Sequence, residues 1–132
     1  MFSIPENFKF GELIGQTLIS ISVQQNMLQL DFGRMDSMDK GKYVDYARIR
    51  IEQGVRWEWN SQVELFTQTS GPRDLTEAAG ILGALVNKSL TAVEPLATQE
   101  LQLTFSTGVR IILLVGELES YHFNSNQGSF TV

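Results

Sequence analysis

The chain of 132 residues contains no cysteine, one histidine and three prolines. The absence of cysteine excludes disulfides, thiolate metal sites and cysteine nucleophiles. It suits a reducing compartment, and we expect the protein in the cytoplasm. A single histidine also cannot build a metal site that needs several imidazole ligands.

Long apolar runs and an excess of positive charge are missing as well. The longest purely apolar run is Ile111–Val115, far shorter than the roughly 20 residues of a membrane-spanning helix. The first ten residues contain no basic stretch followed by an apolar one, which predicts no signal peptide. The net charge of −5 disfavours binding to nucleic-acid phosphates. We therefore expect a protein partner or self-association, with no nucleic acid and no membrane.

The composition that remains is that of one ordinary globular domain, with 42% hydrophobic and 19% charged residues. Three phrases of the sequence occur twice in the same order, with similar apolar positions. The aligned pairs are residues 13–22 with 85–94, 28–33 with 101–106, and 56–60 with 120–124. We interpret them as a duplication, with repeat one over about 6–66 and repeat two over about 74–132.

Alternation of apolar and polar residues predicts antiparallel strands. The predicted strands are 17–23, 27–32, 46–52, 55–59, 89–94, 100–105, 109–115, 119–124 and 129–132. Helical spacing predicts a helix over 74–88, capped by Asp74 with Glu77 three residues later. A shorter helical turn is expected within 6–15, and a hairpin turn at Gln53-Gly54. The predicted fold class is α+β: two helix–β-meander repeats related by an approximate internal two-fold and sharing one core.

Two groups of side chains stand out in the strand over 55–59 and its neighbour. Arg48, Arg50 and Arg56 are close in sequence, and three guanidinium groups can hold a carboxylate or a phosphate. Pairing across the strands with Glu52, Glu58 and Glu64 is the alternative use, and the one that we favour. Trp57 and Trp59 share one face of their strand, which suits either a stacking platform or a core or dimer interface.

Glu119 and His122 form the other candidate pair, because they lie three residues apart at the start of a strand. His122 can act as a general base with Glu119 or Glu117, or it can be an ordinary surface or half-buried side chain. No G-x-S-x-G elbow accompanies them. We therefore expect no catalytic residue, no metal ligand and no cofactor. The predicted ligand- or partner-binding residues are Arg48, Arg50, Arg56, Trp57, Trp59, Glu119 and His122.

The chain resembles small uncharacterised bacterial α+β domains with a duplicated β-meander. The resemblance rests on the opening Leu13-Ile14-Gly15, on the L-x-L-x-F strand at 28–32, and on Glu119-Ser120 before a late aromatic strand. Such families have no established activity, and some small domains of this kind serve as immunity or accessory proteins in toxin systems. The resemblance and the composition favour a non-enzymatic protein-interaction domain, as a homodimer or a toxin-neutralising partner. The alternatives are a small-ligand module with a pocket between the repeats, and an enzyme built on Glu119 and His122.

Overall fold

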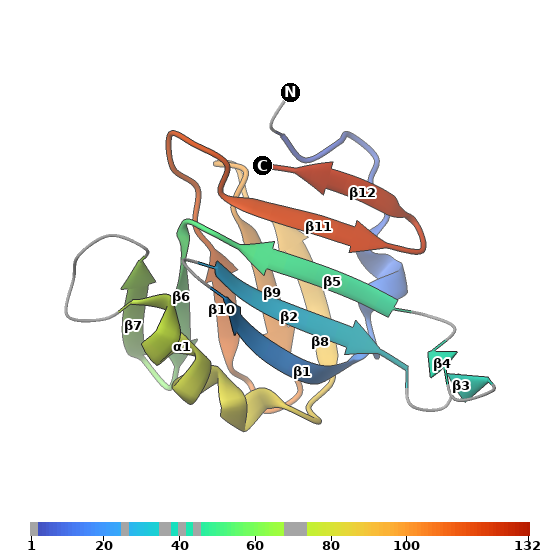
Figure 1. Cartoon of the computed structure of the whole chain (residues 1–132), viewed down its shortest axis with the longest axis horizontal. Helices are drawn as coiled ribbons and strands as arrows, with labels where there is room; N and C mark the ends of the chain where they lie inside the picture. The colour runs from blue at the N-terminus through green and yellow to red at the C-terminus, as the bar shows by residue number, and fades with distance from the viewer. Residues whose placement is uncertain (1–2, 25–26, 35–37, 40–41, 44–45, 68–73) are drawn as a thin grey trace.

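The computed structural model describes residues 3–24, 27–34, 38–39, 42–43, 46–67 and 74–132. These form two five-stranded antiparallel sheets and one short α-helix (Figure 1). Sheet I consists, in order, of β1 (Thr17–Gln24), β2 (Met27–Gly33), β5 (Tyr46–Ile51), β11 (Tyr121–Ser125) and β12 (Gly128–Thr131). Sheet II consists of β7 (Gln62–Thr67), β6 (Gly54–Trp59), β10 (Arg110–Leu113), β9 (Leu101–Phe105) and β8 (Leu90–Pro95). A separate pair joins β3 (Met38–Asp39) to β4 (Lys42–Tyr43).

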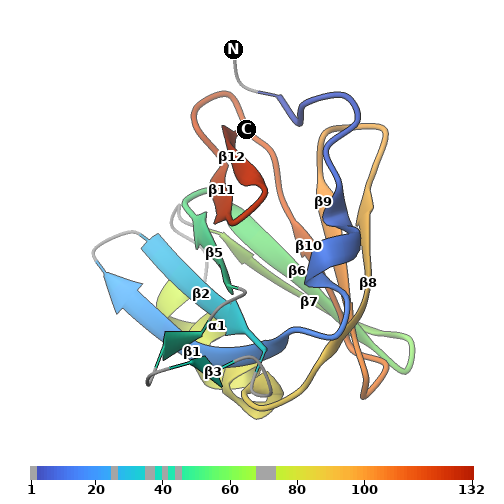
Figure 2. The ribbon, with the colours of Figure 1, turned by 90° about the vertical axis from the view of Figure 1, so that its right-hand side faces the viewer.

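Each half of the chain contributes strands to both sheets. The first half supplies β1, β2 and β5 to sheet I but β6 and β7 to sheet II. The second half supplies β8, β9 and β10 to sheet II but β11 and β12 to sheet I. The ladders β5–β11 and β6–β10 therefore join the two halves. Figure 2 shows the two sheets from the side, with their inner faces turned toward each other.

The space between the sheets is filled by apolar side chains, because alternation places one in every second position. In β2, Leu28, Leu30 and Phe32 point inward and are at most 1% exposed. Phe32 stacks on Phe105 of sheet II, with ring centroids 6.3 Å apart. The fully buried side chains of largest volume are Tyr121, Phe32, Phe66, Phe105 and Phe123.

Helical segments and the N-terminal residues close the open edges of this two-sheet core. The helix α1 (Leu75–Leu82) packs against β1 and β2 of sheet I and against β6 and β7 of sheet II (Figure 1). Phe8 and Phe10 pack against Phe123 of β11 and Phe130 of β12, at the edge of sheet I farthest from β1. The ring centroids of these pairs are 4.9 to 6.0 Å apart. No helix within the described residues is long and apolar enough to cross a membrane.

The chain segments that lead into β1 and β8 are joined by reciprocal main-chain hydrogen bonds. Gly15 N donates to Leu90 O at 2.9 Å, and Asn87 N donates to Leu18 O at 2.8 Å. A second pair follows, Leu18 N to Lys88 O at 3.0 Å and Leu90 N to Gln16 O at 2.9 Å. Gly15 and Asn87 both have positive φ, 89° and 73°. Each bond maps onto its mate at the offset that aligns residues 13–22 with 85–94.

The helical predictions were too long. The helix predicted over 74–88 ends at Leu82 and continues as a 3₁₀ turn, Gly83–Leu85. Glycines at 80 and 83 weaken its last turn. Asp74 caps it as predicted, because its Oδ1 accepts a hydrogen bond from Glu77 N at 3.0 Å. The helical turn predicted within 6–15 is a 3₁₀ turn, Phe10–Leu13. The part of the chain that the structure describes is therefore dominated by its sheets, with one α-helix rather than one in each predicted repeat.

The predicted hairpin turn at Gln53-Gly54 is wrong, because β5 and β6 lie in different sheets. The chain crosses from sheet I to sheet II at this point. Gly54 is buried, and a Cβ atom there would collide with the main-chain oxygen of Phe66 in β7. Glycine therefore permits the close approach of β6 and β7 that this crossing requires.

Tyr121 is buried with its hydroxyl group donating a hydrogen bond to Gln99 O at 2.8 Å. Burial, and secondly the negative charge of Glu100, raises the pKa of Tyr121 above its ordinary value of 10.0. The phenol therefore ionises at lower pH in the unfolded chain than in the folded one. The contribution of the Tyr121 phenol to stability is fully present below the pKa that this group has in the unfolded chain. It is lost as the pH rises from that pKa through the higher pKa of the folded chain.

We expect Tyr121→Phe to lower the free energy of unfolding by about 1 kcal/mol at neutral pH, because one hydrogen bond is lost. We also expect the stability of this variant to fall less steeply than that of the wild type above about pH 10. Urea unfolding of both proteins at neutral and alkaline pH measures the two effects. Equal losses of stability at alkaline pH would contradict the assignment to Tyr121.

Candidate functional site

The outward face of sheet I carries two rows of polar side chains that cross all five strands. Cross-strand pairing defines them from β1 to β12. The first row is Ser20, Asp31, Arg48, Asn124 and Ser129, and the second is Ser22, Gln29, Arg50, His122 and Thr131. The inward residues of the same strands form the core, so alternation alone produces this polar face.

A groove of about 420 Å³ lies over β5, β11 and β12, which are adjacent in Figure 1. Its lining contains Arg48, Arg50, His122, Asn124, Ser129 and Thr131, together with Phe123 and Phe130. The volume is within the range of small-ligand sites, although the groove is open to solvent. Its polar groups include donors suited to oxygen atoms of a ligand.

Arg48 already has a partner at the edge of this groove. Its Nε atom lies 2.8 Å from Asp31 Oδ1. The hydrogen bond and the charge of Asp31 raise the pKa of Arg48. Asp31 also accepts hydrogen bonds from Gln29 Nε2 at 3.1 Å and from Ser20 Oγ at 3.3 Å. The positive charge of Arg48 is therefore compensated within the sheet.

Arg50 differs from the other arginines that the structure describes. Arg56 and Arg110 both pair with Glu58, at 2.7 and 3.0 Å, and Arg34 donates to Ile14 O at 2.9 Å. Within the described residues, Arg50 has neither an ion pair nor a hydrogen bond, and it is exposed in the groove. It lies between Gln29 and His122 across the strands. Its guanidinium group is therefore free to bind an anion.

His122 lies beside Arg50 and makes contacts on both sides of its ring. Nδ1 is 3.0 Å from Thr131 Oγ1, and Nε2 is 3.3 Å from Glu52 Oε2 and 3.4 Å from Glu119 Oε2. Glu52 N donates a main-chain hydrogen bond at 2.9 Å to the carbonyl oxygen of Ser120, the residue that follows Glu119 in the sequence. The structure thus brings Glu119 and His122 together, as the sequence spacing predicts, and adds Glu52.

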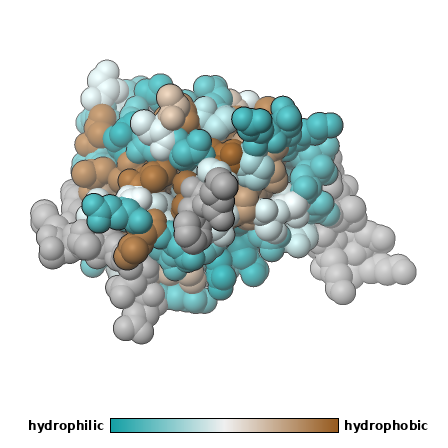
Figure 3. Space-filling model, turned by 90° about the horizontal axis from the view of Figure 1, so that it is seen from above, coloured by the Kyte–Doolittle hydropathy of each residue, from teal (hydrophilic) through white to brown (hydrophobic). Residues whose placement is uncertain are grey.

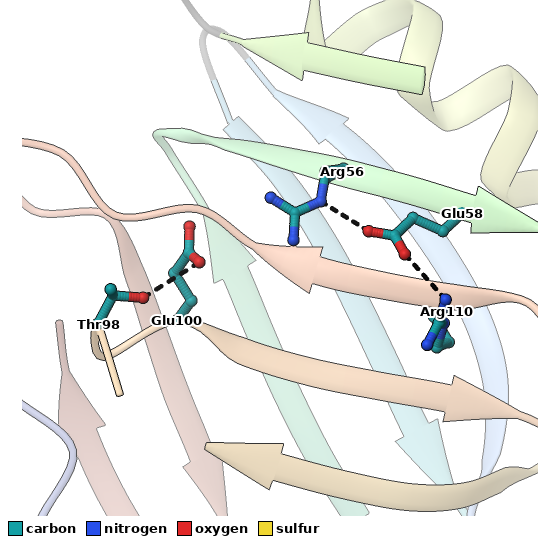
Figure 4. A network of polar contacts seen from close by, with 5 residues as sticks. All are labelled: Arg56, Glu58, Thr98, Glu100 and Arg110. Atoms are coloured by element: carbon teal, nitrogen blue, oxygen red, sulfur yellow. Dashed lines mark hydrogen bonds and ion pairs between the residues drawn. The ribbon is translucent and has the colours of Figure 1, made fainter. Parts of the chain in front are cut away.

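The structure separates the remaining predicted site residues from this groove. Arg56 faces outward on sheet II, where it shares Glu58 with Arg110 (Figure 4). It therefore does not join Arg48 and Arg50. Trp57 packs against the core, whereas Trp59 is 44% exposed, and their ring centroids are 6.5 Å apart.

Sequence reasoning missed Asn124, Ser129 and Thr131 as neighbours of the predicted residues, and it considered Glu52 as a partner of the arginines rather than of His122. Alternation does place all four on outward positions, so a signal was present. What the sequence did not provide was the order of the strands, because β5, β11 and β12 meet only when the second half of the chain adds its last two strands to sheet I.

A second exposed surface is apolar. Val63 and Leu65 are 58% and 53% exposed on the edge strand β7 of sheet II. They lie across from Glu58 and Arg56 on the outward face. The surface of the molecule seen from above also mixes apolar and hydrophilic side chains (Figure 3). The groove on sheet I combines a hollow of about 420 Å³ with the unpaired charge of Arg50, and it is the stronger candidate for a site.

No protein-family model, curated protein or solved structure matches the chain. The groove over β5, β11 and β12 therefore has to be interpreted from its own chemistry.

Proposed function

We propose that the chain is a non-enzymatic protein-interaction domain that holds an acidic side chain of its partner at Arg50. The observation that carries the proposal is the free guanidinium group of Arg50 in the groove on sheet I. The chain has 15 acidic and 10 basic residues, so a neighbouring acid is usually available to an arginine. A guanidinium group left without one, in a hollow, is suited to a carboxylate brought by another molecule.

The surroundings of Arg50 support this binding mode. A carboxylate at Arg50 has Thr131 and Asn124 within the same groove as further hydrogen-bond donors. The groove crosses three strands of a sheet whose other face is the core, so its side chains are held on a rigid support. We propose in addition that the chain is a bacterial protein of the cytoplasm. Its role there would be that of an immunity or accessory protein, which binds its partner through such a surface.

The groove also supports the second candidate, a small-ligand binding module. Its volume of about 420 Å³ is sufficient for a small carboxylate. This ligand would lie on the outer face of sheet I rather than between the repeats, where the core side chains pack. Both candidates share the same chemistry, a carboxylate bound by Arg50, and they differ in whether an extended partner adds contacts.

Fluorescence anisotropy with a labelled peptide of six glutamates tests the proposal at physiological ionic strength, which screens the repulsion between this peptide and the chain's net charge of −5. A peptide of six glutamines is the neutral probe. We expect the acidic peptide to bind and Arg50→Gln to weaken that binding at least about tenfold, because a charge-assisted contact is worth about 1.5–3 kcal/mol. The matched control is Arg110→Gln, an exposed strand arginine on the opposite sheet that Glu58 already pairs.

Equal binding of the two peptides, or unchanged affinity of Arg50→Gln, would contradict a carboxylate site at Arg50. Succinate as a competitor separates the two candidates. If succinate displaces the peptide at concentrations near the peptide's own Kd, the groove is a small-ligand site. Displacement only at far higher concentrations favours a protein partner.

We also propose that the fold has an approximate internal two-fold produced by duplication. Three observations support it: the reciprocal hydrogen bonds between the segments entering β1 and β8, the equivalent strand orders β1-β2-β5-β11-β12 and β8-β9-β10-β6-β7, and a register shift at the same place in β1 and β8. The shifts fall between Leu18 and Ser20 and between Leu90 and Ala92.

A further inference from the structure

The geometry points to a binding site for one divalent transition-metal ion formed by Glu52, Glu119 and His122. This proposal does not require the carboxylate site at Arg50, although His122 and Thr131 also line that groove. It also departs from the sequence analysis, which considered His122 without Glu52 and predicted no metal ligand. The two residues are far apart in sequence and meet only through the pairing of β5 with β11.

The three side chains offer one ligand atom each at distances that suit a metal. His122 Nε2 is 3.3 Å from Glu52 Oε2 and 3.4 Å from Glu119 Oε2, and all three atoms lie within 4.8 Å of one another. Two ligands bound tetrahedrally to Zn²⁺ at about 2.0–2.1 Å are themselves separated by roughly 3.3–3.4 Å. The two nitrogen–oxygen separations therefore match the edge of a tetrahedral site.

Hydrogen bonding alone accounts less well for the arrangement. A charge-assisted hydrogen bond from an N–H group to a carboxylate is shorter, with nitrogen and oxygen about 2.7–2.9 Å apart. His122 Nε2 has at most one proton, and two carboxylates face it. One of the two carboxylates is then left without that proton, close to a like charge. A cation between the three groups satisfies both carboxylates and the nitrogen lone pair together.

The other ring nitrogen has the partner that a metal-bound histidine needs. His122 Nδ1 lies 3.0 Å from Thr131 Oγ1, so a proton on Nδ1 donates to this hydroxyl group. In the tautomer protonated at Nδ1, Nε2 carries no proton and faces the two carboxylates. Thr131 is a positioning residue for the ring, because it would not touch the metal.

The surrounding main chain keeps the ligands in place. Ser120 is fully buried, and its carbonyl oxygen accepts hydrogen bonds from Glu52 N at 2.9 Å and Gln53 N at 3.1 Å. Its hydroxyl group accepts from Gly116 N at 2.9 Å, which fixes the loop that carries Glu119. The ligand side chains remain 28 to 49% exposed, so an ion can enter from solvent and water can complete its coordination.

The mixture of ligand atoms determines the class of ion. Magnesium and calcium prefer sites made only of oxygen atoms, whereas an imidazole nitrogen favours zinc and its first-row neighbours. One imidazole with two carboxylates suits Zn²⁺, and the two negative charges then balance the ion.

Isothermal titration of the untagged protein with ZnCl₂ tests the site, with MgCl₂ as the comparison ion. We expect one Zn²⁺ per chain and no saturable heat with MgCl₂ at the same concentrations. Glu52→Gln and Glu119→Gln should each weaken Zn²⁺ binding at least about tenfold, since removing a supporting group alone costs about 10–100-fold. Glu117→Gln is the matched control, because Glu117 is an exposed acid of the same loop outside the cluster.

A second readout does not depend on affinity. His122 is the only histidine, so a long-range ¹H–¹⁵N spectrum contains a single pair of ring nitrogens. Zn²⁺ should shift the Nε2 resonance and leave Nδ1 protonated. Absence of saturable Zn²⁺ binding, unchanged affinity in both glutamine variants, or coordination through Nδ1 would each overturn the proposal.

Discussion

Separate chains of residues 1–67 and 74–132 are expected not to fold as monomers, and mixing them is expected to restore the native structure. Each fragment alone would contain a three-stranded piece of one sheet and a two-stranded piece of the other. The ladders β5–β11 and β6–β10, which complete both sheets, would be missing. Small sheets with an uncovered apolar face are marginal in water. Fragments of about 60 residues also bury too little surface to offset that loss.

Circular dichroism and the dispersion of amide resonances measure the folding of each fragment, and native mass spectrometry reports its subunit count. The uncut chain is the control. A fragment that unfolds cooperatively as a monomer would contradict the exchange of strands between halves. A fragment that folds only as a homodimer would agree with it, because a second copy then supplies the missing strands, as the proposed duplication implies.

Replacing Phe32 or Phe105 by alanine is expected to lower the free energy of unfolding by about 3–5 kcal/mol each. Both side chains are 1% exposed, and their rings stack across the interface between the sheets. Truncation of either leaves a cavity that the closely packed core fills only in part. A loss of this size is a large share of the 5–15 kcal/mol that stabilises an ordinary domain.

Urea unfolding of the two single variants and the double variant measures both the losses and their coupling. Because the rings are in contact, the double variant should lose less than the sum of the single losses, by about 0.5–1.5 kcal/mol. Leu65→Ala is the control, since this exposed side chain on β7 should contribute about 0.5 kcal/mol or less. Single losses below about 1 kcal/mol would show that the sheets do not pack through these rings.

The strands could be predicted from the sequence because alternation is strong where one face is core. β2 and β9 illustrate this, since Leu28, Leu30 and Phe32 alternate with polar residues, as do their counterparts in β9. β7 was missed because Val63 and Leu65 point outward, so apolar residues occur on both faces and the period of two is hidden.

The topology could not be predicted, because periodicity identifies strands without assigning them to sheets. The residues at 53 and 54 look like a hairpin turn, yet they mark the crossing between the two sheets. The alignment of the aromatic strands was affected in the same way. By position in the sheets, Trp57 pairs with Ile111 and Phe123 pairs with Ile49. If the proposed internal two-fold relates Ile111 to Ile49, Trp57 corresponds to Phe123, two residues away from the alignment made on sequence.

The candidate site was predicted in part for the same reason. Arg48, Arg50 and His122 were identified and lie in one groove, because all three are outward residues of sheet I. Arg56 was grouped with them from its closeness in sequence, but the crossing after β5 places it on the other sheet. Glu52 was not grouped with His122, because only the β5–β11 ladder brings these strands together.

The measurement that most directly tests the central claim is a map of amide chemical-shift changes in the ¹⁵N-labelled protein during titration with the peptide of six glutamates. The account predicts saturable shifts concentrated at Arg50, His122 and Thr131, and their loss in Arg50→Gln. Saturable shifts confined to the apolar edge strand β7, around Val63 and Leu65, would place the interaction surface on sheet II and contradict it.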